Sequence, residues 1–331
     1  VFGPEHGIFG HAGAGEPVPT QIHPRWNIPI YSLYGEHRQP TPEMLEPLDM
    51  LVIDLQDLGV RCYTFCSTLA LCMQAAEEHS LPVVVADRPI PFPGTVDGPM
   101  LDLEYRSFVA HLDVPLVYGM TQGETARWLA STSFPRLELT VINCAGYDGC
   151  PHRPMASPSW VPPSIGIRSW ESAWCYPVTV FTEALPALSC GRDGALAFQL
   201  LGAPWLEGER VAQRVNDLAL PGIECHPHPM TLDRGDEENW SEGIRIHVSD
   251  PQLFLPVTTG ISLLGVLRDF YGNERIWSHG DTRPEFFDSL CGTDSVRRAL
   301  LEDVSVRDIT RAWLNDNELF SKKTRFSRKY V

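Results

Sequence analysis

Three short polar clusters in the first half of the chain carry acids, a histidine and arginines, the side chains of acid–base chemistry. They are Glu5-His6-Gly7, then Asp54, Gln56, Asp57 and Arg61, and finally Asp87-Arg88. Glycoside hydrolysis needs one acid that protonates the leaving oxygen and one carboxylate that acts as base or nucleophile. The residue types therefore indicate acid–base hydrolysis without a cofactor.

The segments around these clusters predict a parallel sheet. Apolar runs at residues 48–53, 81–86 and 137–143 predict buried strands, and helical spacing predicts helices at 61–79 and 121–128. Right-handed crossovers join such strands, and α/β proteins bind ligands at the carboxyl ends of the strands. Residues 1–150 are therefore predicted to form a doubly wound α/β domain that brings the three clusters to one edge.

The second half has a different pattern. Residues 151–165 are rich in proline and predict a loop. A strand is predicted at 244–248, with helices at 211–216, 258–270, 295–302 and 306–317. We expect residues 151–331 to form a smaller α+β domain, with the domain boundary near residue 150.

Charge and composition exclude several classes of protein. Lys plus Arg is 26 and Asp plus Glu is 42, so the formal net charge is −16, which would repel a nucleic-acid backbone. An apolar share of 43% is that of an ordinary globular protein. No uninterrupted apolar run reaches the roughly 18 residues of a membrane span.

Signatures of cofactor and metal enzymes are also missing from the sequence. It has no Gly-x-Gly-x-x-Gly after a strand, no Gly-Lys-Ser/Thr and no Gly-x-Ser-x-Gly. No Cys-x-x-Cys pair occurs, and nine cysteines cannot form a complete set of disulfides. Asp54 and Asp57 are hard oxygen donors for Mg²⁺, but they alone do not define a metal site. We predict no metal and no cofactor.

An ordered series of motifs runs through the chain. It contains Phe2-Gly3-Pro4-Glu5-His6-Gly7, Tyr31-Ser32-Leu33-Tyr34-Gly35, Pro40-Thr41-Pro42-Glu43-Met44-Leu45, Asp54-Leu55-Gln56-Asp57-Leu58-Gly59-Val60-Arg61, Tyr63-Thr64, Asp87-Arg88-Pro89, Val96-Asp97-Gly98-Pro99, Gly119-Met120-Thr121-Gln122-Gly123-Glu124, Tyr176-Pro177 and Gly202-Ala203-Pro204-Trp205. This series resembles the NamZ-like exo-β-N-acetylmuramidases, peptidoglycan hydrolases formerly grouped as a domain of unknown function. The resemblance covers nearly the whole chain.

The resemblance implies a Rossmann-like domain with a smaller second domain and an active-site cleft between them. It implies release of terminal N-acetylmuramic acid from the non-reducing end of peptidoglycan fragments, a bacterial activity of cell-wall recycling. Family members begin with a further strand and helix, so we expect upstream sequence, and with it any targeting signal, to be missing from this chain. A periplasmic or extracellular location would follow from the family alone.

Each candidate site residue has a functional and a structural explanation. The expected catalytic residues are Glu5, His6, Asp57 and Glu124, and the expected substrate-binding residues are Asp54, Gln56, Arg61, Tyr63, Asp87 and Arg88. Glu124 follows Thr121 at capping-box spacing, and Asp54 and Asp57 are also explained as caps of the next helix. Arg61 could pair with Asp57, whereas Arg88 or Arg61 could bind the lactyl carboxylate of muramic acid. Tyr63 and Trp205 are explained more readily as packing aromatics than as platforms for a sugar ring.

The chain departs from the family pattern at a few positions. Ile90 replaces an asparagine in Asp-Arg-Pro-Asn-Pro, and Glu183-Ala184-Leu185-Pro186 replaces Glu-Gly-Thr-Asn. These losses of polar residues leave a second hypothesis open, a non-catalytic protein that binds muropeptides or sugars on the same fold. A third, a Rossmann-type enzyme that uses a nucleotide or Mg²⁺, rests on fold analogy alone.

Overall fold

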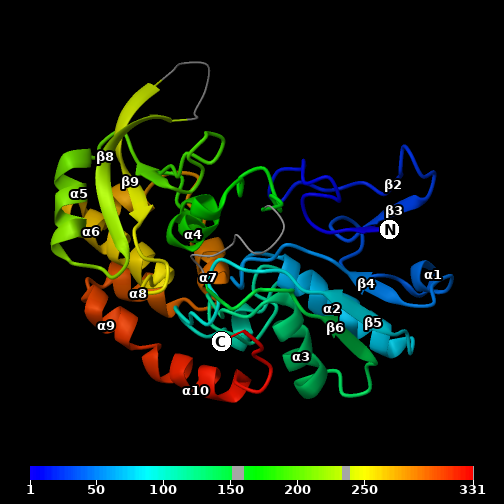
Figure 1. The fold of residues 1–331 in the computed structure, drawn as a ribbon. Helices are drawn as coiled ribbons and strands as arrows, with labels where there is room; N and C mark the ends of the chain where they lie inside the picture. The colour runs from blue at the N-terminus through cyan, green and yellow to red at the C-terminus, as the bar shows by residue number, and fades with distance from the viewer. Residues whose placement is uncertain (151–159, 233–238, 331) are drawn as a thin grey trace. The chain divides into compact units, whose positions relative to one another are not determined.

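The structure is a computed structural model that describes residues 1–150, 160–232 and 239–330. The chain divides into two compact units, which are described separately (Figure 1). Unit 1 comprises Val1–Gly94, Gly119–Ile165 and Lys323–Val331, and unit 2 comprises Thr95–Tyr118 and Gly166–Lys322. Most of the proline-rich loop predicted at 151–165 lies outside the described residues.

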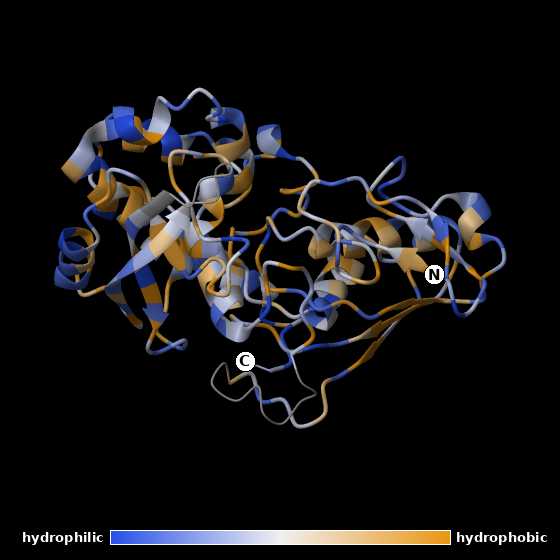
Figure 2. Cartoon of the chain, turned by 90° about the horizontal axis from the view of Figure 1, so that it is seen from above, coloured by the Kyte–Doolittle hydropathy of each residue, from blue (hydrophilic) through white to orange (hydrophobic). Residues whose placement is uncertain are grey.

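The central sheet of unit 1 is parallel, as the sequence predicts. Its strands are β4 (Leu51–Ile53), β5 (Val83–Ala86) and β6 (Leu139–Ile142), which pair in the order β4-β5-β6. Helix α2 (Phe65–Glu78) follows β4, and helix α3 (Gln122–Thr132) precedes β6. Figure 2 shows apolar residues, in orange, concentrated on these strands. The predicted strand–helix–strand unit is confirmed.

The doubly wound arrangement of this sheet stays a prediction. Within the described residues its strands follow one another in sequence order, without the reversal that a doubly wound sheet has. Because both crossovers run in the same direction, right-handed connections place α2 and α3 on the same face, where the two helices contact each other. Val52 and Ile142 on the opposite face are 58% and 57% exposed. The fold is therefore mixed α/β with small parallel sheets.

A second small sheet in unit 1 positions the first polar cluster. Strand β3 (Pro29–Ser32) pairs in parallel with β1 (Phe2–Gly3) and antiparallel with β2 (Gln21–Ile22). The short helix α1 (Pro42–Leu45) follows. Because β1 ends at Gly3, the chain turns directly into Glu5 and His6.

Unit 2 is α+β, but it includes Thr95–Tyr118 and is not the smaller of the two units. Its antiparallel sheet has the order β7-β9-β8, formed by Leu200–Gly202, Asn239–Val248 and Ile223–Leu232. Its helices are α4 (Trp170–Thr179), α5 (Gly208–Asp217), α6 (Pro256–Trp277), α7 (Pro284–Cys291), α8 (Ser295–Leu301) and α9 (Val306–Arg311), and α10 (Leu314–Thr324) leads back to unit 1. Short 3₁₀ turns lie at Leu103–Tyr105 and Val180–Glu183. The single helix predicted at 306–317 is wrong, because the helix breaks between Arg311 and Leu314.

Helix α6 forms the centre of unit 2 and contains a sharp bend. Its first half is apolar and buried, consistent with the helix predicted at 258–270. Gly272 has φ 79° and ψ 157°, outside the helical region, and a conformation that essentially only glycine adopts. The residues after Gly272 therefore point in a new direction. None of the described helices combines the length and apolar character needed to cross a membrane.

Candidate functional site

Glu5 is a buried carboxylate whose two oxygens are held by fixed donors. Its side chain is 6% exposed. Oε1 accepts a hydrogen bond of 2.9 Å from the backbone N–H of Gly15, and Oε2 accepts one of 2.6 Å from the hydroxyl of Thr64. The first donor lies in a loop after β1 and the second at the start of α2, so two distant segments orient one acid.

Thr64 occupies the N-cap position of α2 but does not cap the helix. Its hydroxyl makes no cap hydrogen bond and instead donates to Glu5. A capping hydroxyl is typically worth about 1 kcal/mol to a helix, so the sequence forgoes this stabilisation at the site. The positive end of the helix dipole lies beside the Glu5 carboxylate as a result.

His6 is held in a strained backbone conformation next to Glu5. Its φ is 69°, which is uncommon for a residue other than glycine and costs of order 1–3 kcal/mol. Nδ1 lies 2.9 Å from the carbonyl oxygen of Ala12. Since a carbonyl only accepts, Nδ1 carries the proton, and Nε2 of the neutral ring is a base. The ring also stacks on Tyr63, with centroids 6.3 Å apart.

Tyr34 and Arg38 extend this group toward solvent. Burial raises the pKa of the buried Tyr34, the negative charge of Glu5 raises it further, and Arg38 acts in the opposite direction. The Tyr34 hydroxyl therefore lies near the Glu5 carboxylate. The guanidinium of the exposed Arg38 lies 3.8 Å from the centre of the Tyr34 ring, a cation–π distance. The arrangement places an exposed positive charge one side chain away from a buried acid.

Three of the four residues of the second polar cluster, all but Asp54, are more deeply buried than a substrate-binding surface would be. Asp57 and Arg61 are both 0% exposed. Gln56 is also buried, and its amide donates to the carbonyls of Pro89, at 2.7 Å, and Asp57, at 3.1 Å. These contacts tie the end of β4 to the end of β5.

Asp54 and Arg88 form an ion pair with two hydrogen bonds. Arg88 Nε lies 2.5 Å from Asp54 Oδ1, and Nη2 lies 3.0 Å from Oδ2. Two nitrogens of the guanidinium are thus already engaged with a carboxylate of the protein. The pair raises the pKa of Arg88, chiefly through the hydrogen bond to Asp54.

Asp87 anchors the start of α3. Its Oδ1 accepts from the N–H of Gly123 at 2.8 Å, and its Oδ2 accepts from the hydroxyls of Thr121, at 2.8 Å, and Tyr330, at 2.9 Å. Any side chain at Gly123 would place its Cβ 2.6 Å from the Asp87 carboxyl carbon. Burial raises the pKa of Asp87, and these donors oppose the rise.

Glu124 forms the capping box that its spacing predicts. Its Oε2 accepts from Thr121 N at 3.0 Å, while Thr121 Oγ1 accepts from Glu124 N at 3.2 Å. Oε1 accepts from the backbone N–H groups of Lys329 and Tyr330, at 2.6 and 3.1 Å. Both oxygens are therefore engaged by backbone donors, which favours the structural explanation of Glu124.

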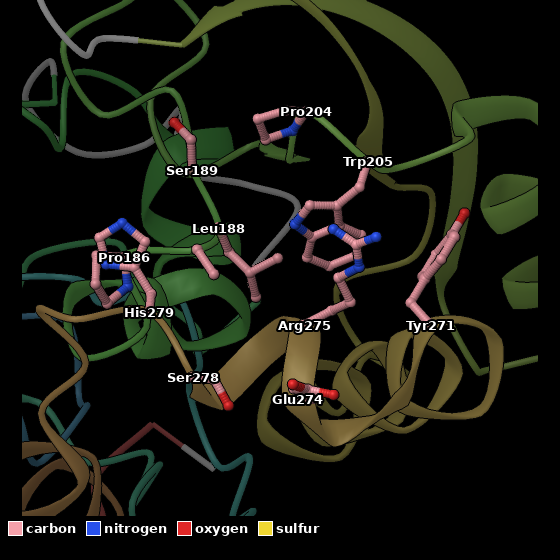
Figure 3. Close-up of a pocket in the computed structure, with 11 residues that line it drawn as sticks. Pro186, Leu188, Ser189, Pro204, Trp205, Tyr271, Glu274, Arg275, Ser278 and His279 are labelled. Carbon is pink, nitrogen blue, oxygen red and sulfur yellow. The ribbon is translucent and has the colours of Figure 1, made fainter.

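A large cavity lies in unit 2 (Figure 3). Its volume is about 640 Å³, and Trp205, Tyr271, Glu274, Arg275 and His279 line it together with apolar residues. Sequence reasoning indicated only Trp205, because the other four come from the second half of α6 and the turn after it. Across the described part of the chain, no group of three or more His, Cys, Asp or Glu side chains is placed to hold a metal ion.

The group around Glu5 contains contacts that sequence patterns did not indicate. Gly15 and Thr64 bind Glu5, and Tyr34 and Arg38 lie beyond them. The sequence motifs include Tyr34 and Thr64 but indicate no role for either. Gly15 has φ 74°, and the glycines of Gly13-Ala14-Gly15 were the available signal of a tight loop. The sequence does not indicate a role for Arg38, since an isolated arginine in a loop is common.

Comparisons with known proteins agree along the whole chain. Residues 1–171 match the family described as exo-beta-N-acetylmuramidase NamZ, N-terminal, and residues 174–330 match its C-terminal counterpart. A peptidoglycan beta-N-acetylmuramidase NamZ of Bacillus subtilis (strain 168) is 34% identical over 97% of this chain and 77% of its own length.

Two crystal structures of DUF1343 family proteins from Bacteroides fragilis NCTC 9343 share the fold. The first has a TM-score of 0.86 and 30% identity, and covers 98% of this chain and 84% of its own. The second has a TM-score of 0.73 and 26% identity, and covers 93% and 82% respectively.

Proposed function

Because the chain belongs to the NamZ family of exo-β-N-acetylmuramidases, we propose that it is a glycosidase that releases N-acetylmuramic acid from the non-reducing end of peptidoglycan fragments. The observation that carries this proposal is the buried Glu5 carboxylate, held by Gly15 and Thr64 and flanked by His6 and Tyr34. We also propose that unit 1 is the Rossmann-like domain of the family and carries the catalytic acid.

Glu5 is the proposed general acid. It gives a proton to the glycosidic oxygen as the bond to the anomeric carbon breaks, and water then adds to that carbon and returns a proton. The Thr64 hydroxyl can bind Glu5 in both of its protonation states, since a hydroxyl donates to a carboxylate and accepts from a carboxylic acid. Positioned proton transfer of this kind contributes roughly 10²–10⁴-fold to the rate.

The second catalytic role has two proposed solutions. Asp57, one of the candidates from the sequence, is the first proposed solution. Its complete burial favours the other solution, in which the 2-acetamido oxygen of the substrate is the nucleophile. In that case His6 Nε2 is the proposed base that activates the attacking water.

A substrate with a trifluoroacetamido group distinguishes these two solutions. Fluorine makes the amide oxygen a weaker nucleophile, so turnover should fall steeply if this oxygen attacks the anomeric carbon. If Asp57 attacks instead, the fluorinated substrate should react at a similar rate to the parent substrate. Asp57→Asn should then abolish turnover.

Arg38 is the proposed contact for the lactyl carboxylate of muramic acid. It is exposed, it lies against Tyr34, and the charge of Glu5 acts on Tyr34, so the guanidinium lies one side chain away from the proposed acid. Arg88 and Arg61 were the candidates from the sequence. The first is bound to Asp54 through two nitrogens and the second is fully buried, so Arg38 is better placed to meet a ligand.

The test of the proposal replaces Glu5 with glutamine. Turnover of a natural muramic-acid-terminated disaccharide should fall by roughly 10²–10⁴-fold, while its affinity and the melting temperature change little. An aryl muraminide with an activated phenolate needs less protonation, so its turnover should fall less. Glu16→Gln, at an exposed position in the same loop, is the control. Near-normal turnover of the disaccharide by Glu5→Gln would exclude Glu5, and intact binding without turnover in the wild type would favour a sugar-binding protein.

A further inference from the structure

The cavity in unit 2 has the size and the wall chemistry of a ligand site. Its volume of about 640 Å³ falls within the roughly 300–1,000 Å³ of small-molecule sites. All the residues that line it belong to unit 2, and none of them belongs to the group around Glu5. The proposed catalytic mechanism leaves it without a role.

One wall of the cavity is aromatic and rigid. The rings of Trp205 and Tyr271 lie with centroids 5.0 Å apart at an angle of 60°. The Tyr271 hydroxyl accepts a hydrogen bond of 2.9 Å from the backbone N–H of Glu207, which fixes the ring in place. Trp205 is partly exposed, so part of its apolar surface faces the cavity (Figure 3).

A second, polar part of the lining comes from the bent end of α6. The bend at Gly272 directs Glu274 and Arg275 to the cavity, and His279 follows the end of the helix. Nδ1 of His279 accepts from the N–H of Asp281 at 3.2 Å, so Nε2 of the neutral ring carries the proton and is a donor. Acceptors and donors are thus both present, and the charges of Glu274 and Arg275 balance.

We propose that this cavity is a second, non-catalytic saccharide-binding site. A pyranose ring has an apolar face of C–H groups, which packs on an aromatic ring, and a rim of hydroxyl and amide groups, which needs both donors and acceptors. The aromatic wall and the polar part of the lining supply these partners. The balanced charge does not favour a phosphate or a cation. The identification of the saccharide as a peptidoglycan glycan rests on the proposed function.

Such a site would hold the polymer while its end is processed. A glycan bound at the cavity raises the local concentration of its terminal residue around the catalytic acid, as linked binding sites do. The effect applies to long glycans and not to a small soluble substrate. The second site should therefore lower the KM for polymeric substrate and leave the hydrolysis of small muraminides unchanged.

The binding experiment uses a soluble glycan fragment that ends in N-acetylglucosamine at its non-reducing end, which an exo-muramidase cannot shorten. Its Kd is measured by calorimetry for the wild type, Trp205→Ala and Arg275→Ala. Trp26→Ala is the matched control, because this tryptophan in unit 1 is 61% exposed and stacks on His23. We expect Trp205→Ala to weaken binding about tenfold, and Trp26→Ala to leave it unchanged.

Hydrolysis of a small aryl muraminide is measured with the same variants. Unchanged kcat/KM together with weaker glycan binding supports the proposal. Unchanged glycan binding in both Trp205→Ala and Arg275→Ala overturns it, and an equal loss of binding and small-substrate turnover overturns it as well, since the cavity would then be part of the catalytic site. Arg275 is exposed, so its variant keeps the test valid if Trp205→Ala fails to fold. The calorimetric result stands even if the wild type does not hydrolyse the muraminide, an outcome that would refute only the proposed function.

Discussion

Removal of Arg38 should lower activity only on substrates that carry the lactyl carboxylate. A hydrogen bond to a charged group is worth about 1.5–3 kcal/mol, and each 1.4 kcal/mol corresponds to about tenfold. The guanidinium lies 3.8 Å from the Tyr34 ring, which restricts its motion and limits the entropy lost on binding. We therefore expect Arg38→Ala to lower kcat/KM for a muramic substrate by about 10- to 100-fold. Arg38→Lys should have an intermediate effect, because lysine keeps the charge but loses the planar fork and most of the stacking.

The assay compares an aryl N-acetylmuraminide with the matched N-acetylglucosaminide, which differ only in the lactyl ether. Arg38→Ala should lower kcat/KM for the first and change it little for the second, and added salt should reduce the difference in the wild type. Arg25→Ala, at an exposed position near the same small sheet, controls for a general loss of positive charge. An equal loss on both substrates would show that Arg38 supports Tyr34 and Glu5 rather than binding the lactyl group. No loss on either would remove it from the site.

Three further predictions concern stability, measured by urea unfolding. Tyr330→Phe should destabilise the protein by about 1–3 kcal/mol, because the hydroxyl accepts from Cys144 N at 2.8 Å and donates to Asp87 at 2.9 Å. A smaller loss of stability would show that water replaces the hydroxyl. Burial raises the pKa of Asp97 above its unfolded value, so its contribution to stability is greatest below about pH 4 and falls as the pH rises to the folded pKa. The stability advantage of the wild type over Asp97→Asn should therefore shrink with increasing pH, and an advantage that grows would contradict this sign. Gly272→Ala should lower the free energy of unfolding by about 1–3 kcal/mol. The loss comes from the φ of 79° alone, since a Cβ at this position meets no atom within 4 Å. An unchanged stability would mean that the backbone at the bend relaxes freely.

Periodicity predicted the regular elements well and their limits less well. The apolar run at residues 48–53 became a strand only at Leu51–Ile53, and the helix predicted from residue 61 begins at Phe65. The residues directly before Phe65 form turns, and the hydroxyl of Thr64 bonds to Glu5. The strands β1, β2 and β3 escaped prediction as a sheet because each has only two to four residues, and because β1 pairs with β3 across nearly 30 residues of sequence.

The candidate site was predicted as residue types and not as contacts. Glu5 and His6 stood out because they follow a strand end, and the capping box of Glu124 followed from local spacing. The pairing of Asp54 with Arg88 spans 34 residues, and the bond between Thr64 and Glu5 spans 59, so no local pattern carries either. The backbone donor Gly15 could not be predicted from a side chain, because the contact is made by its amide.

The return of the C-terminal residues to unit 1 sets the order in which the protein can mature on the ribosome. Glu124 holds the backbone of Lys329 and Tyr330, and the Tyr330 hydroxyl reaches Asp87, so unit 1 gains these bonds only after unit 2 has been synthesised. In a nascent chain stalled before residue 323, Asp87 and Glu124 at the start of α3 would lack their bonds to Lys329 and Tyr330. This region would stay open to chaperones and proteases throughout the translation of unit 2. Synthesis from the N-terminus thus cannot complete unit 1 before unit 2 has been translated.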